Sequence, residues 1–366
     1  MTAEVETPVT RRELLGILEG DQPEADSRPA ASPTDNPVSK YPKPPYKKQS
    51  QPWPGLASRM EPRPDHGEES YRGSGRLLGR RALITGGDSG MGRAAAIAFA
   101  REGADVAINY LPDEESDAGE VIALIEAAGR VGLALPGDLR SEAFCEQLVA
   151  DALRGLGGLD IIVNNAGRQQ SRASILDIST EDFDATMKTN IYAPFWIIKS
   201  ALPHLKPGAV LIGTASEQAY DPSKDLYDYA QTKAAIVNYT KSLAKQLGPK
   251  GIRVNAVAPG PIWTPLQVSG GASMEKLEHF GEQTPLGRAG QPAELRSTFS
   301  WPPTTRATPR GTSTAQRAAA ANRDKFVVAA SFARERLARA AHRVVVMHEN
   351  VQPLSACRRH SNAYIK

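Results

Sequence analysis

The chain has 366 residues, of which 40% are hydrophobic and 23% are charged, a balance typical of a globular protein in water. The formal net charge of +3 is small, and the central region carries no basic patch interleaved with aromatic residues, so we expect no nucleic-acid partner. Cys145 and Cys357 are too few for a disulfide framework or a metal–thiolate site, and no apolar run approaches the roughly 20 residues of a membrane-spanning helix.

Residues 1–76 are dense in Pro, Ser, Lys and Glu. Such a segment buries too little apolar surface to offset its chain entropy, so we expect an extended, largely disordered arm. Within the arm, Trp53 and Leu56 can either anchor it on a neighbouring surface or belong to a solvated tail. The sequence leaves both interpretations open.

The N-terminus also bears on the cellular compartment. Arg11 and Arg12 are followed by a short apolar run, as in a twin-arginine export signal, but Glu19 and Asp21 interrupt that run. We therefore do not expect export. The low cysteine content is consistent with a reducing compartment, and we expect a cytoplasmic protein.

Between about residues 77 and 295, short apolar runs alternate with amphipathic stretches, which predict strands and helices respectively. The predicted strands are 81–85, 105–109, 131–135, 159–163, 209–213 and 252–257, and the predicted helices are 94–102, 118–128, 142–156, 183–205 and 226–247. Near-continuous apolar strands separated by helices predict a parallel sheet covered on both faces. We therefore expect a single α/β catalytic domain with a doubly wound parallel sheet, the Rossmann fold.

The segment Thr85-Gly86-Gly87-Asp88-Ser89-Gly90-Met91-Gly92 follows the first predicted strand and opens a helix. In such a loop Gly86 permits a sharp turn, Gly90 lets the backbone approach a pyrophosphate, and Gly92 allows close packing of helix and strand. The helix N-terminus offers unpaired N–H groups to the anion. By itself a glycine-rich loop often marks an ordinary turn, but its place after a buried first strand favours a dinucleotide site.

Four motifs, each after a predicted strand, resemble the short-chain dehydrogenase/reductase family in residues 77–295. They are the Thr-Gly-x-x-x-Gly-x-Gly loop, Asp138-Leu139, Asn164-Asn165-Ala166-Gly167 and Pro259-Gly260. The Asp-Ser variant of the loop and the Pro-rich arm further resemble a bacterial general-stress-type subgroup of NAD(P)-dependent aldehyde reductases. The resemblance implies these cofactor-binding residues: Gly86, Asp88, Ser89, Gly90, Met91, Gly92, Asn109, Asp138, Leu139, Asn165, Ala166, Gly167, Tyr229, Lys233, Pro259, Gly260, Ile262 and Thr264.

Tyr229 and Lys233 stand four residues apart in a predicted helix, so both can point into one cleft. A tyrosine has a pKa of about 10, and a neighbouring ammonium is expected to lower that pKa. Ser216 lies thirteen residues before Tyr229, the spacing of the family's catalytic serine, and Asn190 matches its fourth member. The resemblance implies that Tyr229 is the general acid or base, Ser216 binds the reacting oxygen, Lys233 holds the nicotinamide ribose, and Asn190 positions a proton-relaying water.

Other polar residues lie near these motifs. Tyr227 has no lysine four residues on, so we interpret it as packing or pocket wall. Gln218, Tyr220 and residues 168–170 can either line the substrate pocket or serve the surface, and 263–285 is interpreted as a mobile lid. His204 and His279 lack companions for a metal site, and the family chemistry needs no metal.

The second strand gives the signal for cofactor choice. An acid at its end would bind the ribose diol of NAD and repel a 2′-phosphate, but this strand ends in Asn109-Tyr110. Against NADP, Ser89 occupies a place where NADP-preferring relatives often carry arginine, and Asp88 adjoins it. We expect NADP or NAD as cofactor, with NADP slightly favoured.

Residues 296–366 depart from the family's pattern of a helix followed by a last strand. Codons allowed for residues 300–319, read two bases on, can spell Leu-Ala-Ser-Asp-Asp-Ser-Ser-Tyr and then Ala-Thr-Gly, which resembles that strand. We hypothesise a frameshift near residues 295–297, natural or from sequencing. Loss of the strand would expose a sheet edge and lower stability. The homo-oligomer implied by the resemblance, such as a homotetramer, is then in doubt.

These patterns predict an NAD(P)-dependent oxidoreductase that moves a hydride between nicotinamide and a small-molecule aldehyde, ketone or alcohol. Within enzymes, a fatty-acyl ketoreductase or a sugar dehydrogenase is the main rival to aldehyde reduction. The alternative from another class is a nucleotide-binding Rossmann protein that is inactive because its last strand is lost. Fold alone does not separate the two classes, but a mere binder needs neither Ser216 nor Asn190.

Overall fold

The computed structural model describes residues 36–299. The expectations for residues 1–35 and for the tail beyond Phe299, including the frameshift, lie outside the described residues. Residues 36–41 form a short turn, in which Asn36 Oδ1 accepts a hydrogen bond from the Val38 N–H at 3.0 Å, and they belong to a separate unit from residues 42–299.

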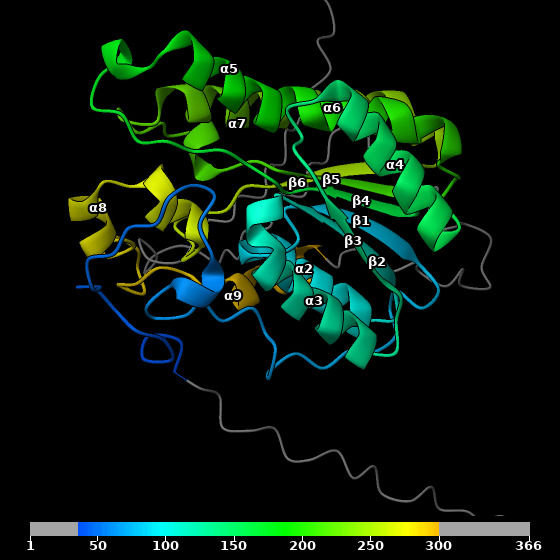
Figure 1. Cartoon of the computed structure of the whole chain (residues 1–366), viewed down its shortest axis with the longest axis horizontal. Coiled ribbons are helices and arrows are strands. Elements are labelled where there is room, and N and C mark those ends of the chain that lie inside the picture. Colours follow the sequence, from blue (N-terminus) through cyan, green and yellow to red (C-terminus); the bar gives the residue numbers. More distant parts are fainter. Residues whose placement is uncertain (1–35, 300–366) are drawn as a thin grey trace, which may run out of the picture. The chain divides into compact units, whose positions relative to one another are not determined.

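Six parallel strands form one sheet in the order β3-β2-β1-β4-β5-β6 (Figure 1). They are β1 (Arg81–Thr85), β2 (Asp105–Tyr110), β3 (Gly132–Pro136), β4 (Ile161–Asn164), β5 (Val210–Thr214) and β6 (Arg253–Val257). Leu83 of β1 pairs with Ala107 of β2 on one side and with Ile162 of β4 on the other. The chain therefore changes direction across the sheet between β1 and β4, which is where ligands bind in open α/β folds.

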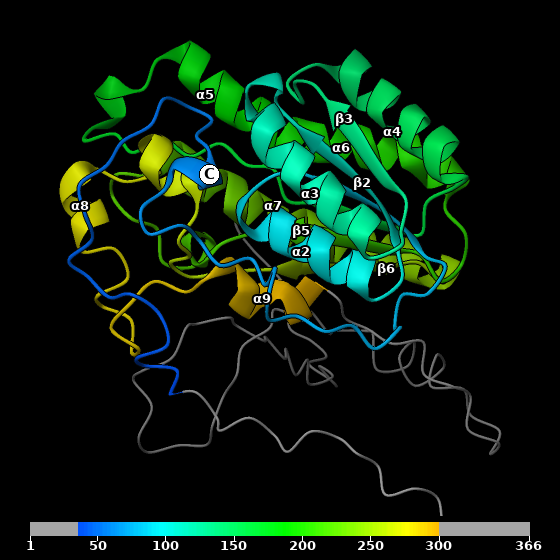
Figure 2. The ribbon, with the colours of Figure 1, turned by 60° about the horizontal axis from the view of Figure 1, so that its bottom comes forward.

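Helices cover both faces of this sheet (Figures 1 and 2), which confirms the predicted doubly wound α/β fold. One face carries α2 (Gly90–Arg101), α3 (Glu115–Ala127) and α9 (Pro292–Phe299), and the other carries α4 (Glu142–Leu156), α6 (Ala193–Ala201) and α7 (Tyr227–Leu247). Since successive side chains of a strand point to opposite faces, Ile84 packs in the first core and its neighbour Leu83 in the second. No helix among residues 36–299 has the length and apolar character to span a membrane.

The single helix predicted over 183–205 is wrong. The structure has α5 (Thr180–Met187), a π-helical turn (Lys188–Tyr192), α6, and a 3₁₀ turn (Leu202–His204) in its place. A π turn adds a residue to the helical repeat, so it rotates the side chains that follow it, and such turns concentrate at functional sites. The sequence pattern does not reveal it, because residues Lys188–Tyr192 contain neither a glycine nor a proline that would mark a break in the helix.

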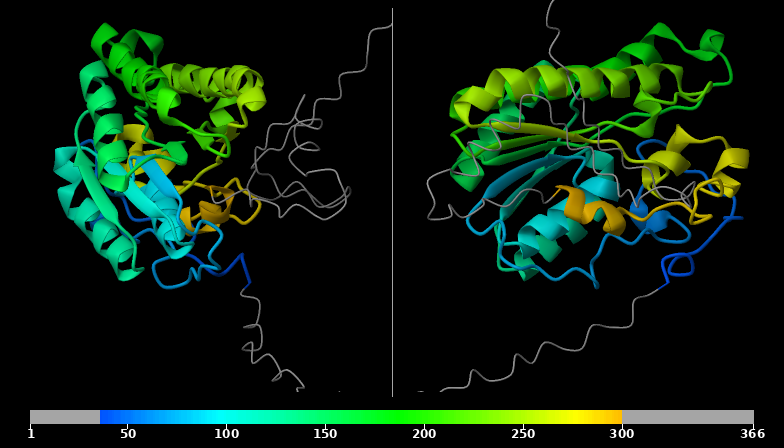
Figure 3. Two further views of the ribbon diagram at one scale, coloured as in Figure 1. Left: turned by 90° about the vertical axis from the view of Figure 1, so that its right-hand side faces the viewer. Right: turned by 180° about the vertical axis from the view of Figure 1, so that it is seen from behind.

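The expected disordered arm is not what the structure shows for residues 42–76. Although this segment has little regular structure beyond the 3₁₀ turn Ala57–Arg59, it runs along the domain beside α9 and beside residues 263–285, called the lid segment below (Figure 3). Tyr46 and Met60 are buried with Trp263, and the rings of Tyr46 and Trp263 stack at a centroid distance of 4.4 Å. These contacts are long-range, so local composition does not indicate them. Leu56 and Trp53 are only partly buried.

The end of the arm is held by one buried carboxylate, that of Glu102. It accepts hydrogen bonds from the backbone N–H groups of Ser74 and Arg76, both at 2.9 Å, from the Arg76 guanidinium at 2.7 Å, and from the Tyr71 hydroxyl. Burial raises the pKa of Glu102, but the hydrogen bonds from Arg76 and Tyr71 outweigh it and lower the pKa from 4.5 to about 2.

We expect Glu102→Gln to destabilise the fold by ~3 kcal/mol at pH 7, because lowering the Glu102 pKa from 4.5 to about 2 stabilises the folded state by about that much. A depressed folded-state pKa stabilises above the unfolded value, so the difference between wild type and variant narrows as the pH falls from 4.5 towards 2. Urea unfolding at pH 7, 4 and 3 measures this. The control is Glu126→Gln on the exposed side of α3, expected within ~0.5 kcal/mol of wild type. An equal loss at all three pH values would contradict the assignment.

Candidate active site

The loop between β1 and α2 needs glycine for two different reasons. Gly86 and Gly90 have φ angles of 60° and 51°, in the left-handed region that other residues disfavour. A Cβ on Gly92 would lie 1.9 Å from the carbonyl oxygen of Gly86, so no side chain fits there. The loop therefore forms a backbone cradle at the N-terminus of α2, and this cradle fits the pyrophosphate of a dinucleotide.

The segment after β4 braces that cradle. The Asn165 side-chain amide donates to the carbonyl oxygens of Thr85 and Gly86 at 3.2 and 3.0 Å. In return, the Thr85 hydroxyl accepts from the backbone N–H groups of Asn165 and Ala166 at 3.0 and 3.1 Å. The two motifs thus hold one another across the β1–β4 boundary, which explains why the chain carries both.

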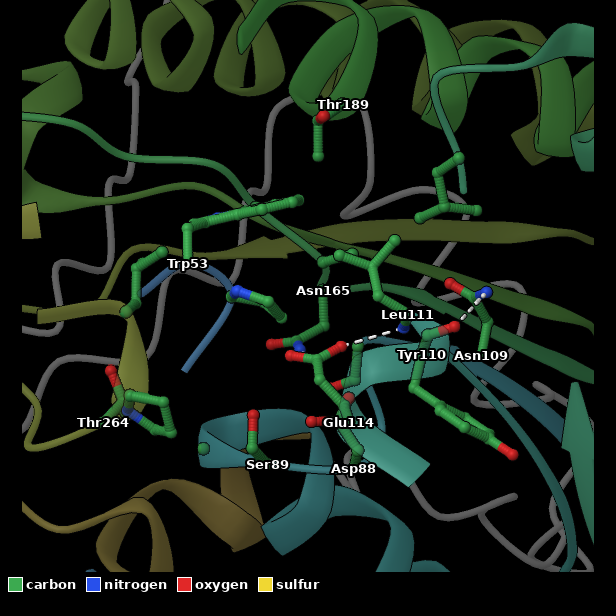
Figure 4. A pocket seen from close by; sticks show the side chains of 18 of the residues that line it. Trp53, Asp88, Ser89, Asn109, Tyr110, Leu111, Glu114, Asn165, Thr189 and Thr264 are labelled. Carbon is green, nitrogen blue, oxygen red and sulfur yellow. Dashed lines mark hydrogen bonds between the residues drawn. The ribbon is translucent and has the colours of Figure 1, made fainter. Parts of the chain in front are cut away.

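A cavity opens at the carboxyl ends of β1, β2, β3 and β4 (Figure 4), the edge of the sheet where ligands bind in open α/β folds. Of the residues expected to bind cofactor, it is lined by Gly86, Asp88, Ser89, Gly90, Met91, Asn109, Asp138, Leu139, Asn165, Ala166, Gly167 and Thr264. The structure thus brings most of the predicted cofactor set to one place.

Six other members of the predicted cofactor set do not line this cavity. Gly92 instead faces the Gly86 carbonyl, and Ile262 is buried in the core beneath α2. Pro259 accepts a hydrogen bond from the Glu217 N–H at 2.9 Å, and Gly260 follows it along the chain. Their placement supports the walls of the site rather than forming them, while Tyr229 and Lys233 also lie outside the lining.

Sequence reasoning missed several lining residues. Trp53 and Pro54 come from the arm, and Thr189 comes from the π turn, two features whose position the local sequence does not reveal. Glu114 comes from the chain after β2, where the 3₁₀ turn Pro112–Glu114 folds back so that the Leu111 N–H donates to Glu114 Oε2 at 2.8 Å. The Pro112 that begins this turn is the signal that could have revealed it.

Two carboxyl groups meet in the wall of the cavity. Asp88 and Glu114 are both buried and lie side by side in Figure 4. Burial raises the pKa of each, and the neighbouring Asp88 raises the pKa of Glu114 further. The pair therefore retains a proton at neutral pH, and this wall of the cavity carries less negative charge than two acidic residues suggest.

The tyrosine and lysine of the predicted catalytic set lie on one face near the start of α7. Tyr229 is 7% exposed and Lys233 3% exposed, and the Lys233 ammonium nitrogen lies 5.2 Å from the centre of the Tyr229 ring. Lys233 Nζ donates to the carbonyl oxygen of Thr214, the last residue of β5, at 2.7 Å. Ser216 follows that strand and its hydroxyl hydrogen-bonds Tyr229.

The expected lowering of the Tyr229 pKa is wrong for the protein without ligand. Burial raises the pKa of Tyr229 to about 12, even though the hydrogen bond from Ser216 lowers it. Burial also lowers the pKa of Lys233 to about 7. Desolvation of both groups, which the sequence pattern does not contain, outweighs their mutual attraction. Tyr229 is therefore a protonated phenol at neutral pH.

Asn190 lies in the π turn, with its side chain turned towards the catalytic set. Its oxygen accepts from the Arg168 N–H at 2.8 Å, and its amide donates to the Arg168 carbonyl and the Thr232 hydroxyl at 2.9 and 3.0 Å. A Cβ placed on Gly167 would lie 3.6 Å from Lys233 Nζ and 3.7 Å from Asn190 Oδ1. Because Gly167 lines the cavity, the catalytic set adjoins it at this end.

The remaining candidates have structural partners. Arg168 pairs with Asp182 at 2.6 Å, Gln169 donates to the Gly271 carbonyl at 2.7 Å, and Gln170 donates to the Ser269 carbonyl at 3.2 Å. The last two bonds tie this segment to the expected lid, which contains α8 (Met274–Glu278). Tyr227, expected to pack or to line a pocket, is 47% exposed instead.

Gln218, Tyr220 and His279 do not line the cavity. The Gln218 side chain accepts from the Ser223 N–H at 2.7 Å, whereas Tyr220 is 39% exposed and His279 pairs with Glu282 on the surface. Within residues 36–299, no group of three or more His, Cys, Asp or Glu side chains has the geometry to hold a metal ion.

Comparisons with known proteins agree with this geometry. A family model described as enoyl-(acyl carrier protein) reductase matches residues 86–301. The uncharacterized oxidoreductase YghA of Escherichia coli is 56% identical over 264 residues, which cover 72% of this chain and 90% of that protein. General stress protein 39 of Bacillus subtilis is 48% identical over 241 residues, or 66% of this chain and 84% of that protein.

Two further similarities carry chemical names. NADPH-dependent aldehyde reductase 1, a chloroplastic protein of Arabidopsis thaliana, is 41% identical over 251 residues, covering 67% of this chain and 87% of that protein. The crystal structure of a short-chain dehydrogenase from Burkholderia cenocepacia in complex with NADP is 36% identical, with a TM-score of 0.57 over 61% of this chain and 89% of that chain. The family resemblance is thereby confirmed, and the chain belongs to the short-chain dehydrogenase/reductase family of oxidoreductases.

Proposed function

We propose that this protein reduces aldehydes or ketones to alcohols with a nicotinamide dinucleotide, using Tyr229 as general acid. The observation that carries the proposal is the buried, protonated phenol of Tyr229, hydrogen-bonded by Ser216 and adjoining the cavity. A phenol that keeps its proton at neutral pH can donate it to an oxygen on which negative charge develops. In the reductive direction Tyr229 is thus the proton donor.

A nicotinamide dinucleotide held in this cavity would supply the hydride that the carbonyl carbon takes up. Tyr229 donates its proton to the carbonyl oxygen as the C=O double bond becomes a C–O single bond, and it then regains a proton from solvent. In this proposal the Ser216 hydroxyl, which hydrogen-bonds Tyr229, donates to the same oxygen, and that interaction strengthens as charge accumulates there. Lys233, beside the ring, and Asn190, which fixes the backbone of Arg168, hold the site in shape.

We propose NADP as the preferred cofactor. β2 ends in Asn109 and Tyr110, neither of which repels a 2′-phosphate, and the Asn109 amide donates to the carbonyl oxygens of Leu135 and Gly137, both at 3.1 Å. The retained proton on Asp88 and Glu114 reduces the remaining negative charge in the cavity wall. The Arabidopsis relative is named for NADPH, and the Burkholderia structure holds NADP, in line with this proposal.

The test is oxidation of NADPH and of NADH, followed at equal concentrations across a panel of aldehydes, ketones, acyl thioester ketones and sugars. We expect turnover of aldehydes or simple ketones with a kcat/KM at least ~10-fold higher for NADPH than for NADH, since tenfold corresponds to only about 1.4 kcal/mol. Dinucleotide binding without turnover of any carbonyl compound would instead favour the inactive nucleotide-binding alternative. A higher kcat/KM with NADH would overturn the cofactor preference alone.

A further inference from the structure

The N-terminal arm reaches the dinucleotide cavity. Trp53 and Pro54 line it together with the phosphate loop and residues Thr264–Leu266, and Figure 4 places Trp53 on the side of Thr264, across the cavity from Asn109. Nothing in the glycine-rich loop or the catalytic motifs calls for this contact. The aromatic ring comes from a segment far from those motifs in sequence.

The loop that carries Trp53 closes on itself. The Gln51 side chain accepts from the Leu56 N–H at 2.8 Å and donates to the Leu56 carbonyl at 3.1 Å, so residues 51–56 form a ring of fixed span. The backbone N–H of Gln51 donates to the Val268 carbonyl of the lid segment at 3.0 Å. Trp53 therefore stands on a braced loop rather than on a loose arm.

The other end of this loop is fixed to the domain. The N–H of Ala57 donates to Asp117 Oδ2 at 2.6 Å, and Asp117 is a fully buried carboxylate on α3. Between the two attachments, Gly55 has a φ of 84°, and a Cβ there would lie 3.1 Å from the Ser269 Cβ. The loop and residues 263–285 are thus in close contact at Gly55, where a side chain would crowd Ser269.

The indole of Trp53 suits a ligand. Its ring is partly buried, and among the described residues its N–H has no hydrogen-bond partner, whereas a tryptophan at an apolar–polar boundary normally uses that donor. Across the cavity the wall is polar, with Asn109, Asp88 and Glu114. The indole therefore offers a flat apolar surface and one N–H donor on the side of the cavity opposite that polar wall, and a dinucleotide can lie between the two.

We propose that residues 51–58 are part of the cofactor site, with Trp53 covering the bound nicotinamide dinucleotide and Gly55 positioning it. This inference rests on the proposed function, because it requires that dinucleotide to occupy the cavity. It assigns the arm a binding role in addition to its packing against the domain. Removing the indole then weakens cofactor binding without unfolding the protein.

The first test measures binding of NADPH to the full-length protein by titration calorimetry. We expect Trp53→Ala to raise Kd about 10-fold and Trp53→Phe about 3-fold, with the melting temperature of the cofactor-free protein unchanged. The matched control is Trp196→Phe on α6, whose ring contacts Tyr192 and does not line the cavity. Equal Kd values for wild type, Trp53→Ala and Trp53→Phe would overturn the proposal.

A second readout reports proximity and does not depend on turnover. Excited tryptophan transfers energy to reduced nicotinamide, so Trp53→Phe should lose more of the sensitised NADPH emission than Trp196→Phe does. Equal losses in the two variants would contradict the placement of Trp53 over the cofactor. If wild type binds neither NADPH nor NADH, the proposed function fails together with this inference; if wild type binds and the Trp53 variants bind equally well, only this inference fails.

The positioning role of Gly55 has its own signature. We expect Gly55→Ala to raise Kd several-fold, because the added Cβ both strains a left-handed φ and presses on Ser269. If Gly55 acts through Trp53, the double variant Gly55→Ala/Trp53→Ala will bind no more weakly than Trp53→Ala alone. Fully additive losses would show that Gly55 does not act through the indole.

Discussion

Tyr229→Phe is expected to lower kcat for carbonyl reduction by ~10²- to 10⁴-fold, the range typical for loss of a general acid. The Tyr229 phenol is buried, and its oxygen is hydrogen-bonded by Ser216. Because Tyr229 lies outside the lining of the dinucleotide cavity, the Kd for NADPH should change by less than about 3-fold. Steady-state kinetics and calorimetry on the same preparation measure both quantities.

The chain provides a matched control two residues earlier. Tyr227 begins the same helix but is 47% exposed, so Tyr227→Phe should retain wild-type kcat. Comparing the two separates loss of the proton donor from any general effect of removing a hydroxyl from α7. Retained turnover in Tyr229→Phe would remove this residue from the mechanism, and equal losses in both variants would point to a structural effect on the helix.

The fold was predictable because its determinants are local. Most of the strands are buried on both faces and are largely apolar, and the helices between them show a periodic apolar face, so the sequence pattern predicts the alternation of strands and helices from β1 to β6. The edge strand β3 is only partly buried. Predicted strand boundaries differ from the observed ones by at most two residues, as for β3, observed at Gly132–Pro136 and predicted at 131–135.

The arm and the π turn were not predictable, since both depend on partners distant in the chain. Tyr46 stacks on Trp263, and the Gln51 N–H donates to the Val268 carbonyl, so contacts with residues 263–285 hold part of the arm. Likewise, Asn190 of the π turn donates hydrogen bonds to the Arg168 carbonyl and the Thr232 hydroxyl, and both of these partners are distant in the chain. Local sequence propensity carries no information about such distant partners.

The electrostatics of the site were predictable in part. The i, i+4 spacing correctly indicated that Tyr229 and Lys233 share one helical face, and the ring and ammonium do lie close together. The sign of the Tyr229 pKa shift was wrong because it is set by burial, a property of the assembled fold. In the same way, Glu114 entered the cavity wall through a turn that places a residue beyond β2 beside Asp88.

Gly92→Ala is expected to weaken NADPH binding by at least ~100-fold, or about 2.7 kcal/mol, measured by calorimetry. The added Cβ would lie 1.9 Å from the Gly86 carbonyl oxygen and 2.6 Å from the Asn165 amide nitrogen. Neither atom is the end of a flexible side chain that can move away freely, because Asn165 is itself bonded to the loop. The N-terminus of α2 must therefore shift from β1, and the pyrophosphate cradle is lost.

The control for Gly92 is a second helical glycine with nothing around it. Gly119 in α3 is exposed, and a Cβ there meets no atom within 4 Å, so Gly119→Ala should leave Kd unchanged and stabilise the helix by about 0.5–1 kcal/mol. Thermal melts of both variants separate a local change in the cradle from global unfolding. If Gly92→Ala bound NADPH as tightly as wild type, the close approach of loop and helix would not be what forms the phosphate site, and the assignment of the cavity to a dinucleotide would lose its structural basis.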